Sequence, residues 1–419
     1  MRQHFIVLLM MINIPAFSQN ARDYIDQSYR TLDDMPDSAY IYANMAITKA
    51  SEESNTDLLL EALYTKGYLE KYHNGSIAAS IVVYMEAIRV GEGVTSEKGR
   101  DQLLSVYKNI GNIYNKYLLD YTEASNYYIK ALDLAQQLNN GYDISHLSYL
   151  IGSIYLSMND YERAEEFTIK AFEKNKEVGN KELELKILSS WSYIDEKKGD
   201  IQSALERNQR SYAIAKGYEK VDYQILALQN IANLQYKKGD LDSALLRYKE
   251  VIKLAQIHNN KRIQKIASLD LAELHLDTEK PEMAYQVLER GKLLSTADVR
   301  TLKTLRRINA QLGNYQDALS FSIHADSLTK LKIKDQQLLN VEVQRAQVNQ
   351  KIAEYHYILE REKEINNLVN QIKWSVVGIF LLVTLAVAYD LWRKTKRKKD
   401  LEAHIKAFRS DMDDLSLNI

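Results

Sequence analysis

The sequence of 419 residues contains no cysteine, only three prolines and only fifteen glycines. Without cysteine the chain can form no disulfide, no thiolate zinc site and no cysteine nucleophile. Because proline and glycine interrupt helices, their scarcity favours a largely helical chain with short turns. Charge is nearly balanced, with 55 basic against 56 acidic residues, so no overall positive charge attracts nucleic acid.

The signatures of catalysis are also missing. The eight histidines are scattered, and no two of them have the spacing of a metal-binding pair. The sequence has no His-Glu-x-x-His motif, no glycine-rich phosphate loop and no Gly-x-Ser-x-Gly elbow. We therefore expect no enzyme, and neither a metal nor another cofactor.

What the sequence does contain is a long-period repeat. Five alanines recur at a constant interval of 40 residues, a sixth follows after 34, and a turn signal precedes four of the six. The alanines are Ala124, Ala164, Ala204, Ala244, Ala284 and Ala318, and the turn signals are Asn159-Asp160, Gly199-Asp200, Gly239-Asp240 and Gly313-Asn314. A fixed period of this length predicts stacked copies of one supersecondary unit.

The segment from Ser189 to Lys216 illustrates one unit. We expect Gly199 to end a first helix, because glycine adopts the left-handed conformation at little cost. Asp200 is then placed to cap a second helix through the free amides of its first turn. Ala204 is small, which allows the two helices to approach closely. The apolar face of such a hairpin is too wide to bury alone, so neighbouring copies must cover it.

These features resemble the tetratricopeptide repeats. The resemblance rests on small and aromatic residues at matching positions in successive units: Tyr107-Ile110-Gly111-Tyr114 with Ala124-Tyr128-Ala131, and Ile151-Gly152-Tyr155 with Ala164-Phe167-Ala171. It implies an all-α fold, in which helical hairpins build a right-handed superhelix over residues 21–328, with about seven units and a partial first one. Ser192, Ala232 and Arg306 depart from the small residue that the family favours, and the period exceeds the family's usual 34, so we expect longer helices.

The resemblance also implies a partner site. Tetratricopeptide arrays bind a protein or peptide in a concave groove lined by the first helix of each pair. By alignment, eight residues line the groove here: Lys108, Asn112, Asn115, Tyr149, Ser153, Tyr193, Asn233 and Tyr236. Lys108 and Asn112 also match two members of a clamp that some family members use for a terminal carboxylate, but Leu150 and Ser190 occupy two other clamp positions.

A different pattern follows the repeats, over residues 331–372. Apolar residues recur there at alternating spacings of three and four, which favours a helix that pairs along a narrow stripe. The stripe, which we call the seam, consists of Leu338, Val341, Val348, Ile352, Tyr355 and Leu359, with Arg345 as its one polar member. The spacing is compatible with a homodimer through the 338–372 helix and equally with a helix folded back on the repeats.

Residues 374–392 form an apolar stretch between Trp374 and Trp392. As a helix these 19 residues would be about 28 Å long, close to the hydrocarbon thickness of about 30 Å, and tryptophans suit the two interfaces. Six basic residues follow at once: Arg393, Lys394, Lys396, Arg397, Lys398 and Lys399. We expect one transmembrane helix and a short cytoplasmic tail over 393–419, basic and then acidic, with no nucleic-acid site within this chain.

The N-terminus agrees with this topology. Residues 1–18 have a positive start at Arg2, an apolar run of about ten residues and small residues at a cleavage site, as a secretory signal peptide has. We therefore expect a bacterial inner-membrane protein with exported, periplasmic repeats and a cytoplasmic C-terminus. It is similar to the sensor halves of one-pass bacterial signalling proteins. One hypothesis is a non-enzymatic sensor for a protein or peptide, and the alternative is a membrane-tethered scaffold with no transmembrane signalling.

Overall fold

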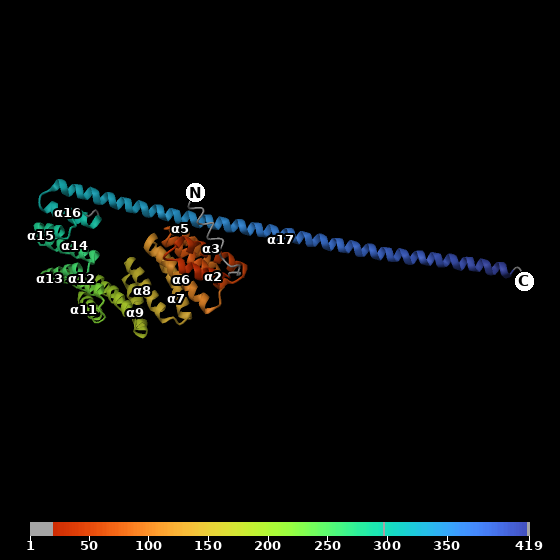
Figure 1. Ribbon diagram of the computed structural model, residues 1–419, viewed down its shortest axis with the longest axis horizontal. Helices are drawn as coiled ribbons and strands as arrows, with labels where there is room; N and C mark the ends of the chain where they lie inside the picture. Colours follow the sequence, from red (N-terminus) through yellow and green to blue (C-terminus); the bar gives the residue numbers. More distant parts are fainter. Residues whose placement is uncertain (1–19, 296–297, 417–419) are drawn as a thin grey trace. The chain divides into compact units, whose positions relative to one another are not determined.

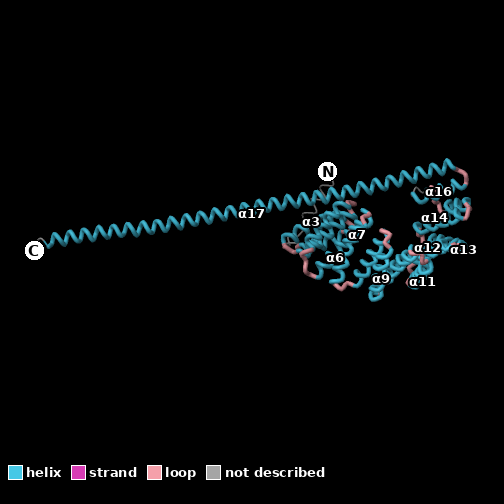
Figure 2. The backbone as a smooth tube through the Cα atoms, turned by 180° about the vertical axis from the view of Figure 1, so that it is seen from behind, coloured by secondary structure: helices cyan, strands magenta, loops and turns pink. Residues whose placement is uncertain are grey.

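The computed structural model describes residues 20–295 and 298–416, and the chain divides into two compact units after Gln347. The described residues form helices joined by turns, which confirms the predicted all-α class (Figures 1 and 2). The expected signal peptide at residues 1–18 lies outside the described residues. The helices are α2 (Ala21–Thr31), α3 (Pro36–Glu52), α4 (Thr56–Tyr72), α5 (Ile77–Gly91), α6 (Glu97–Ile113), the π-helix η1 (Tyr114–Leu118), α7 (Tyr121–Gln137), α8 (Gly141–Ser157), α9 (Tyr161–Val178), α10 (Lys181–Lys197), α11 (Ile201–Gly217), α12 (Val221–Lys238), α13 (Leu241–Ile257), α14 (Lys261–Asp277), α15 (Pro281–Arg290), α16 (Val299–Gln311) and α17 (Tyr315–Ser416).

The first unit is a superhelix of helical hairpins, as predicted. Each helix from α2 to α16 packs mainly on the helix before it and the helix after it, and Figure 1 shows them following one another in chain order. The first helices of the successive pairs are α2, α4, α6, α8, α10, α12 and α14, and the second helices are α3, α5, α7, α9, α11, α13 and α15. Buried apolar residues form a series of clusters along the hairpins, because each hairpin covers only its neighbours.

The 40-residue period arises from a turn every 20 residues. Helices α7 to α14 are each 17 or 18 residues long, and a short turn follows each one. Each of these turns holds one residue with positive φ, as does the turn before α7: Leu119, Asn139, Asn159, Gly179, Gly199, Glu219, Gly239, Asn259 and Glu279. The predicted left-handed conformation of Gly199 is thus confirmed, with φ of 88°. Leu119, Glu219 and Glu279 adopt the same conformation at a steric cost that glycine avoids.

Capping residues repeat with the turns. Asp120, Asp160, Asp200 and Asp240 each accept a hydrogen bond from the backbone amide three residues later and begin the second helices. Asn140, Asn180 and Asn260 do the same for the first helices. The predicted cap at Asp200 is confirmed by its 3.0 Å bond from the amide of Ser203. Each such cap stabilises its helix by about 1 kcal/mol.

The small residues lie where two helices of one hairpin approach each other. Ala124, Ala164, Ala204, Ala244 and Ala284 are fully buried. At Gly111, an added Cβ would lie 2.6 Å from the ring of Tyr128 on the facing helix, so only glycine fits. Ser192 departs from the family pattern, yet its hydroxyl donates a 3.0 Å hydrogen bond to the carbonyl of Ala204. Because Ser192 is buried, that bond gives its hydroxyl the hydrogen-bond partner that water would otherwise supply.

The part of α17 that belongs to the first unit packs against η1 and the core cluster beside it. Val343 is only 4% exposed and belongs to the cluster that contains Tyr114, with Leu339 and Ala346 packed beside it. Gln336 donates a 2.6 Å hydrogen bond to the backbone carbonyl of Tyr117, and Gln347 donates a 3.0 Å bond to the hydroxyl of Tyr114. The last carbonyls of a helix have no partner within it, and Gln336 satisfies that of Tyr117 near the end of η1.

Two faces of α17 therefore differ in their surroundings. The docked stripe consists of Gln336, Leu339, Val343, Ala346 and Gln347, while the seam residues Leu338 and Val341 are 58% and 42% exposed. At about 100° per residue, the docked stripe and the seam lie on opposite sides of the helix. Residues 336–347 do fold back on the repeats, but through a stripe that differs from the seam.

Candidate functional site

All eight residues predicted to line the groove lie on first helices or on η1. Lys108 and Asn112 are on α6 and Asn115 is on η1, whereas Tyr149 and Ser153 are on α8, Tyr193 is on α10, and Asn233 and Tyr236 are on α12. This common placement puts them on the side of the superhelix that the first helices form. Their individual contacts, however, separate them into two groups.

The residues near α6 are engaged in internal contacts. Lys108 forms a 2.5 Å ion pair with Asp143, whose backbone amide donates to the Asn140 cap at the start of α8. Asn112 accepts a 2.9 Å hydrogen bond from the hydroxyl of Tyr128. Burial raises the pKa of Tyr128, and a hydrogen bond from the side chain of Asn115 offsets part of that rise. These groups hold neighbouring helices together, so a carboxylate bound by Lys108 would have to displace Asp143.

Three of the remaining residues are likewise committed to the array. The hydroxyl of Ser153 donates to the backbone carbonyl of Tyr149 at 2.9 Å, and the Tyr149 ring stacks on His146 with centroids 6.4 Å apart. Tyr236 is half-buried, and its hydroxyl hydrogen-bonds to Asp277 on α14. The first two contacts lie within α8 and the third links α12 to α14, and together they leave little of each side chain for a partner.

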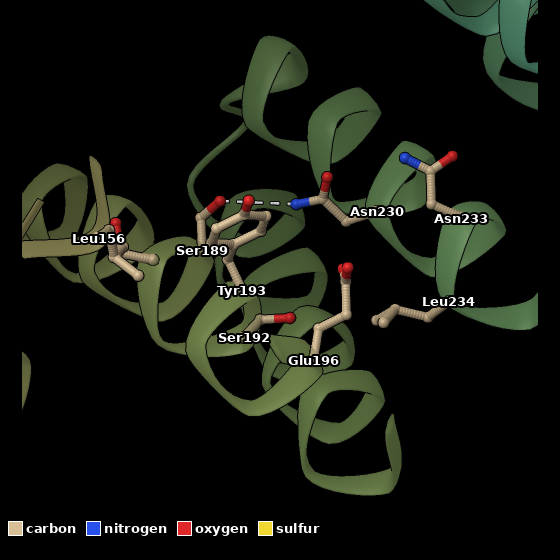
Figure 3. A pocket seen from close by; sticks show the side chains of 9 residues that line it. Leu156, Ser189, Ser192, Tyr193, Glu196, Asn230, Asn233 and Leu234 are labelled. Carbon is tan, nitrogen blue, oxygen red and sulfur yellow. Dashed lines mark hydrogen bonds between the residues drawn. The ribbon is translucent and has the colours of Figure 1, made fainter. Parts of the chain in front are cut away.

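Tyr193 and Asn233 have a different setting, because they line one cavity of about 250 Å³ (Figure 3). The cavity lies across three successive first helices, α8, α10 and α12, and most of its lining residues are polar. Its lining residues are Leu156, Ser189, Ser190, Ser192, Tyr193, Glu196, Asn230, Asn233 and Leu234. Figure 3 shows Tyr193 and Asn230 facing each other across the gap between α10 and α12.

A buried hydrogen-bond network fixes the wall of this cavity. Asn208 is 1% exposed, and its amide nitrogen bonds to the carbonyl of Ala204 at 2.9 Å and to the hydroxyl of Ser192. Its side-chain oxygen accepts a 3.1 Å bond from Asn230, which also lies 3.5 Å from the hydroxyl of Ser189. Because Asn208 is buried and fully bonded, it holds Asn230 in one orientation.

The cavity offers both a hydrogen-bond donor and an acceptor. The side-chain oxygen of Asn233 accepts a 2.6 Å hydrogen bond from the hydroxyl of Tyr248. The amide nitrogen of Asn233 points away from Tyr248 and has no hydrogen-bond partner among the described residues. The amide nitrogen of Asn230 is used by Asn208, which leaves the side-chain oxygen of Asn230 without a described partner. A fixed amide donor next to a fixed amide acceptor matches the C=O and N–H groups of a polypeptide backbone.

Charge in the cavity is small and largely compensated. Glu196, its one acidic lining residue, pairs with Lys237 on α12. The ammonium of Lys197 lies 5.0 Å from the centre of the Tyr193 ring, and Tyr193 is 43% exposed. The described residues contain no cluster of histidine and acidic side chains that could hold a metal ion. The cavity is therefore suited to neutral polar contacts and to packing on an aromatic ring.

The sequence analysis missed Ser189, Glu196 and Asn230. The sequence did contain a signal for these residues, because Ser189 and Glu196 lie on the same face of α10 as Tyr193. Likewise, Asn230 lies three residues before Asn233 and so on the same face of α12. Asn208 could not have been found this way, since it lies on a second helix and reaches the cavity only through its contact with Asn230.

The second unit holds the remaining predicted residues, all on α17. Trp374 and Trp392 are 75% and 57% exposed, and the seam residues Val348, Ile352, Tyr355 and Leu359 are exposed as well. Among the basic residues, Lys394 pairs with Asp390 at 2.8 Å, and Lys396 lies 5.4 Å from the Trp392 ring. Among the described residues one helix, α17, is long and apolar enough to cross a membrane, and its most apolar window is not buried.

Comparisons with known proteins agree with this architecture. Residues 99–176 match the profile of the tetratricopeptide repeat, a family that is generally a non-enzymatic, protein-binding scaffold. No curated protein matches the chain significantly. Among solved structures, the apo form of RapI is 16% identical, with a TM-score of 0.50 over 73% of this chain and 99% of RapI.

Two further structures have the same fold. A Rap protein complexed with Competence and Sporulation Factor is 12% identical, with a TM-score of 0.50 over 79% of this chain and 98% of its own. Aspartyl phosphate phosphatase F from Bacillus subtilis is also 12% identical, with a TM-score of 0.50 over 76% of this chain and 96% of its own. The repeat period, the hairpin packing and these matches lead to one conclusion: the first unit has the fold of tetratricopeptide repeats, and residues 99–176 match that family.

Proposed function

We propose that this chain is a single-pass membrane protein whose exported repeats bind an extended segment of a protein or peptide and report its presence through α17. The observation that carries the proposal is the cavity across α8, α10 and α12, where Asn230 and Asn233 present an unused acceptor and an unused donor beside Tyr193. The proposed role is that of the input half of a signalling protein.

The chemistry of the cavity favours a polypeptide over a small charged ligand. A peptide bond placed between Asn230 and Asn233 satisfies both amides, and a side chain of the partner packs on the exposed Tyr193 ring. Buried charge contributes little, because Glu196 is already paired with Lys237. Tetratricopeptide repeats form a protein- and peptide-binding fold, and the Rap protein of the same fold is known in complex with Competence and Sporulation Factor.

The membrane part of the proposal rests on the second unit. The apolar segment 374–392 is exposed along its length, so in water it would leave large hydrophobic side chains unburied. A bilayer covers such a segment, and the tryptophans at its ends suit the interfaces. Six basic residues follow directly, which supports a cytoplasmic position for the C-terminal side and export of the repeats.

The link between the two parts favours a sensor over a passive scaffold. Helix α17 continues without a break from Tyr315 to Ser416, and its residues 336–347 pack on η1. We propose that partner binding alters the packing of the first helices and thereby the docking of this segment. A ligand can shift such an equilibrium only if it binds one docking state better than the other.

The seam supports pairing with a second copy in the same bilayer. Because it lies opposite the docked stripe, one helix can contact its own repeats and a second copy at the same time. Two copies inserted with the same topology present their seams in parallel and in register, so Leu338 faces Leu338 and Ile352 faces Ile352. Arg345 within the seam weakens this pairing through repulsion between like charges, as suits an interface that switches.

Photocrosslinking in the native membrane tests the groove. A photoreactive residue replaces Tyr193 in the full chain, and a control variant carries it at Tyr218, a more exposed tyrosine at the end of the second helix α11. The proposal predicts a discrete protein adduct at position 193 that is lost in Asn233→Leu and absent at position 218. Equal adducts at both positions, or adducts with lipid only, would contradict partner binding in the groove.

A further inference from the structure

A second cavity, of about 300 Å³, lies outside the groove, on the side formed by second helices. It contains more charged residues than the cavity beside Tyr193. Helices α13 and α15 form its walls and α14 forms its floor. Each wall contributes residues at helical spacing: Lys249, Ile252, Lys253 and Gln256 from α13, and Met283, Gln286, Val287 and Arg290 from α15, with Ser268, Leu271 and His275 from the floor. We call it the basic crevice.

The charges of the basic crevice all have one sign. Its lining contains Lys249, Lys253 and Arg290 and no Asp or Glu. None of these three cations forms an ion pair within the described part of the chain. The lining thus differs from the whole chain, in which 56 acidic residues balance 55 basic ones.

The packing of α14 explains why no carboxylate reaches these cations. The acidic residues Asp270, Glu273 and Asp277 are on another face of α14, where Arg300 and Arg307 on α16 pair with them. The cations next to α16 are therefore neutralised and those in the crevice are not. Three unpaired cations around one cavity repel each other, and a bound anion relieves that repulsion.

The floor supplies a polar group that lacks a partner. His275 is 5% exposed, and its Nδ1 has no hydrogen-bond partner among the described residues. Burial lowers the pKa of His275, and Lys249 and Lys280 lower it further, so the imidazole is neutral near pH 7 and offers one donor and one acceptor. A buried, unbonded nitrogen of this kind costs free energy unless a ligand satisfies it.

The rest of the floor is apolar. Leu271 is 3% exposed, and Ile252 and Val287 are half-buried around it. A simple inorganic anion would leave this surface without contact. A small carboxylate with an apolar body would cover it while its charge meets the cations at the rim.

We propose that the basic crevice binds a small organic carboxylate. Its apolar body packs on Leu271, Ile252 and Val287, and its carboxylate lies between Arg290 and Lys253 within reach of His275. The proposal is independent of the groove on the first helices, because no residue lines both cavities.

The test uses 4-fluorobenzoate, followed by fluorine NMR on the full chain in lipid nanodiscs. The proposal predicts saturable binding that Arg290→Gln weakens at least about tenfold, as expected for loss of a charge-assisted hydrogen bond. The matched control is Arg306→Gln, which removes an exposed arginine of α16 outside the crevice and should leave the affinity unchanged. Lys253→Met, which keeps the apolar stem, should also weaken binding.

Two further probes separate the contributions of charge and apolar contact. Neutral 4-fluorobenzyl alcohol should bind at least about tenfold more weakly than 4-fluorobenzoate, and inorganic phosphate should not displace 4-fluorobenzoate at equal concentration. Equal binding of the alcohol, displacement by phosphate, or equal effects of Arg290→Gln and Arg306→Gln would each overturn the proposal. So would the absence of saturable binding.

Discussion

Replacing Gly111 by alanine tests the close approach of helices that defines the repeat. The added Cβ would lie 2.6 Å from two ring atoms of Tyr128, a distance that real Cβ atoms do not tolerate. Tyr128 is fully buried and its hydroxyl is bonded to Asn112, so the ring cannot move without further loss. Overpacking of this kind costs about 1–3 kcal/mol, while alanine in place of a helical glycine gains about 1 kcal/mol. We expect a net loss of about 0–2 kcal/mol.

A second glycine isolates the packing effect. Gly217 ends helix α11, and an added Cβ there meets no atom within 4 Å. Gly217→Ala should therefore show only the gain of about 1 kcal/mol, so the two variants should differ by the overpacking cost of about 1–3 kcal/mol in urea unfolding followed by circular dichroism. Combining Gly111→Ala with Tyr128→Leu should remove most of the overpacking cost. Equal stability of the two single alanine variants would refute the reasoning.

Two other predictions concern α17 and a buried histidine. Val343→Asp should release residues 336–347 from the repeats and raise the rate of their amide hydrogen exchange. Val341→Asp, on the exposed seam, should leave that rate unchanged. Equal exchange rates in the two variants would contradict the docking. Burial, with Lys108 nearby, lowers the pKa of His146 to about 4, against 6.5 as its ordinary value. The unfolded chain then binds the proton more readily, so stability should fall by about 2 kcal/mol between pH 7 and pH 5, and His146→Gln should remove that part of the loss in urea unfolding. An unchanged pH dependence in His146→Gln would contradict the buried, neutral state.

The repeat architecture could be predicted because its signals are local and recur. Alanines at a 40-residue interval and the Gly199-Asp200 turn each report a requirement of the hairpin itself, namely close approach, a left-handed residue and a cap. The turns at Glu219 and Glu279 carry no such signal, because the surrounding structure forces glutamate into a conformation that it rarely adopts.

The functional surfaces could be predicted only in part. Tyr193 and Asn233 were found from their places on first helices, but Asn208 acts through a tertiary contact that no local pattern encodes. The docked stripe of α17 was missed because two of its members are glutamines, and their partners Tyr117 and Tyr114 lie more than 200 residues earlier in the chain. The basic crevice could not be predicted either, because its unpaired cations depend on the tertiary packing by which Arg300 and Arg307 on α16 pair with the carboxylates of α14.

The central claim is that the groove and the basic segment lie on opposite sides of a membrane. Because the chain has no cysteine, a single introduced cysteine is a unique label. In cells stripped of their outer membrane, a membrane-impermeant maleimide should label Tyr193→Cys at once and Thr395→Cys only after the membrane is permeabilised. Labelling of both before permeabilisation, or of Thr395→Cys alone, would contradict the account.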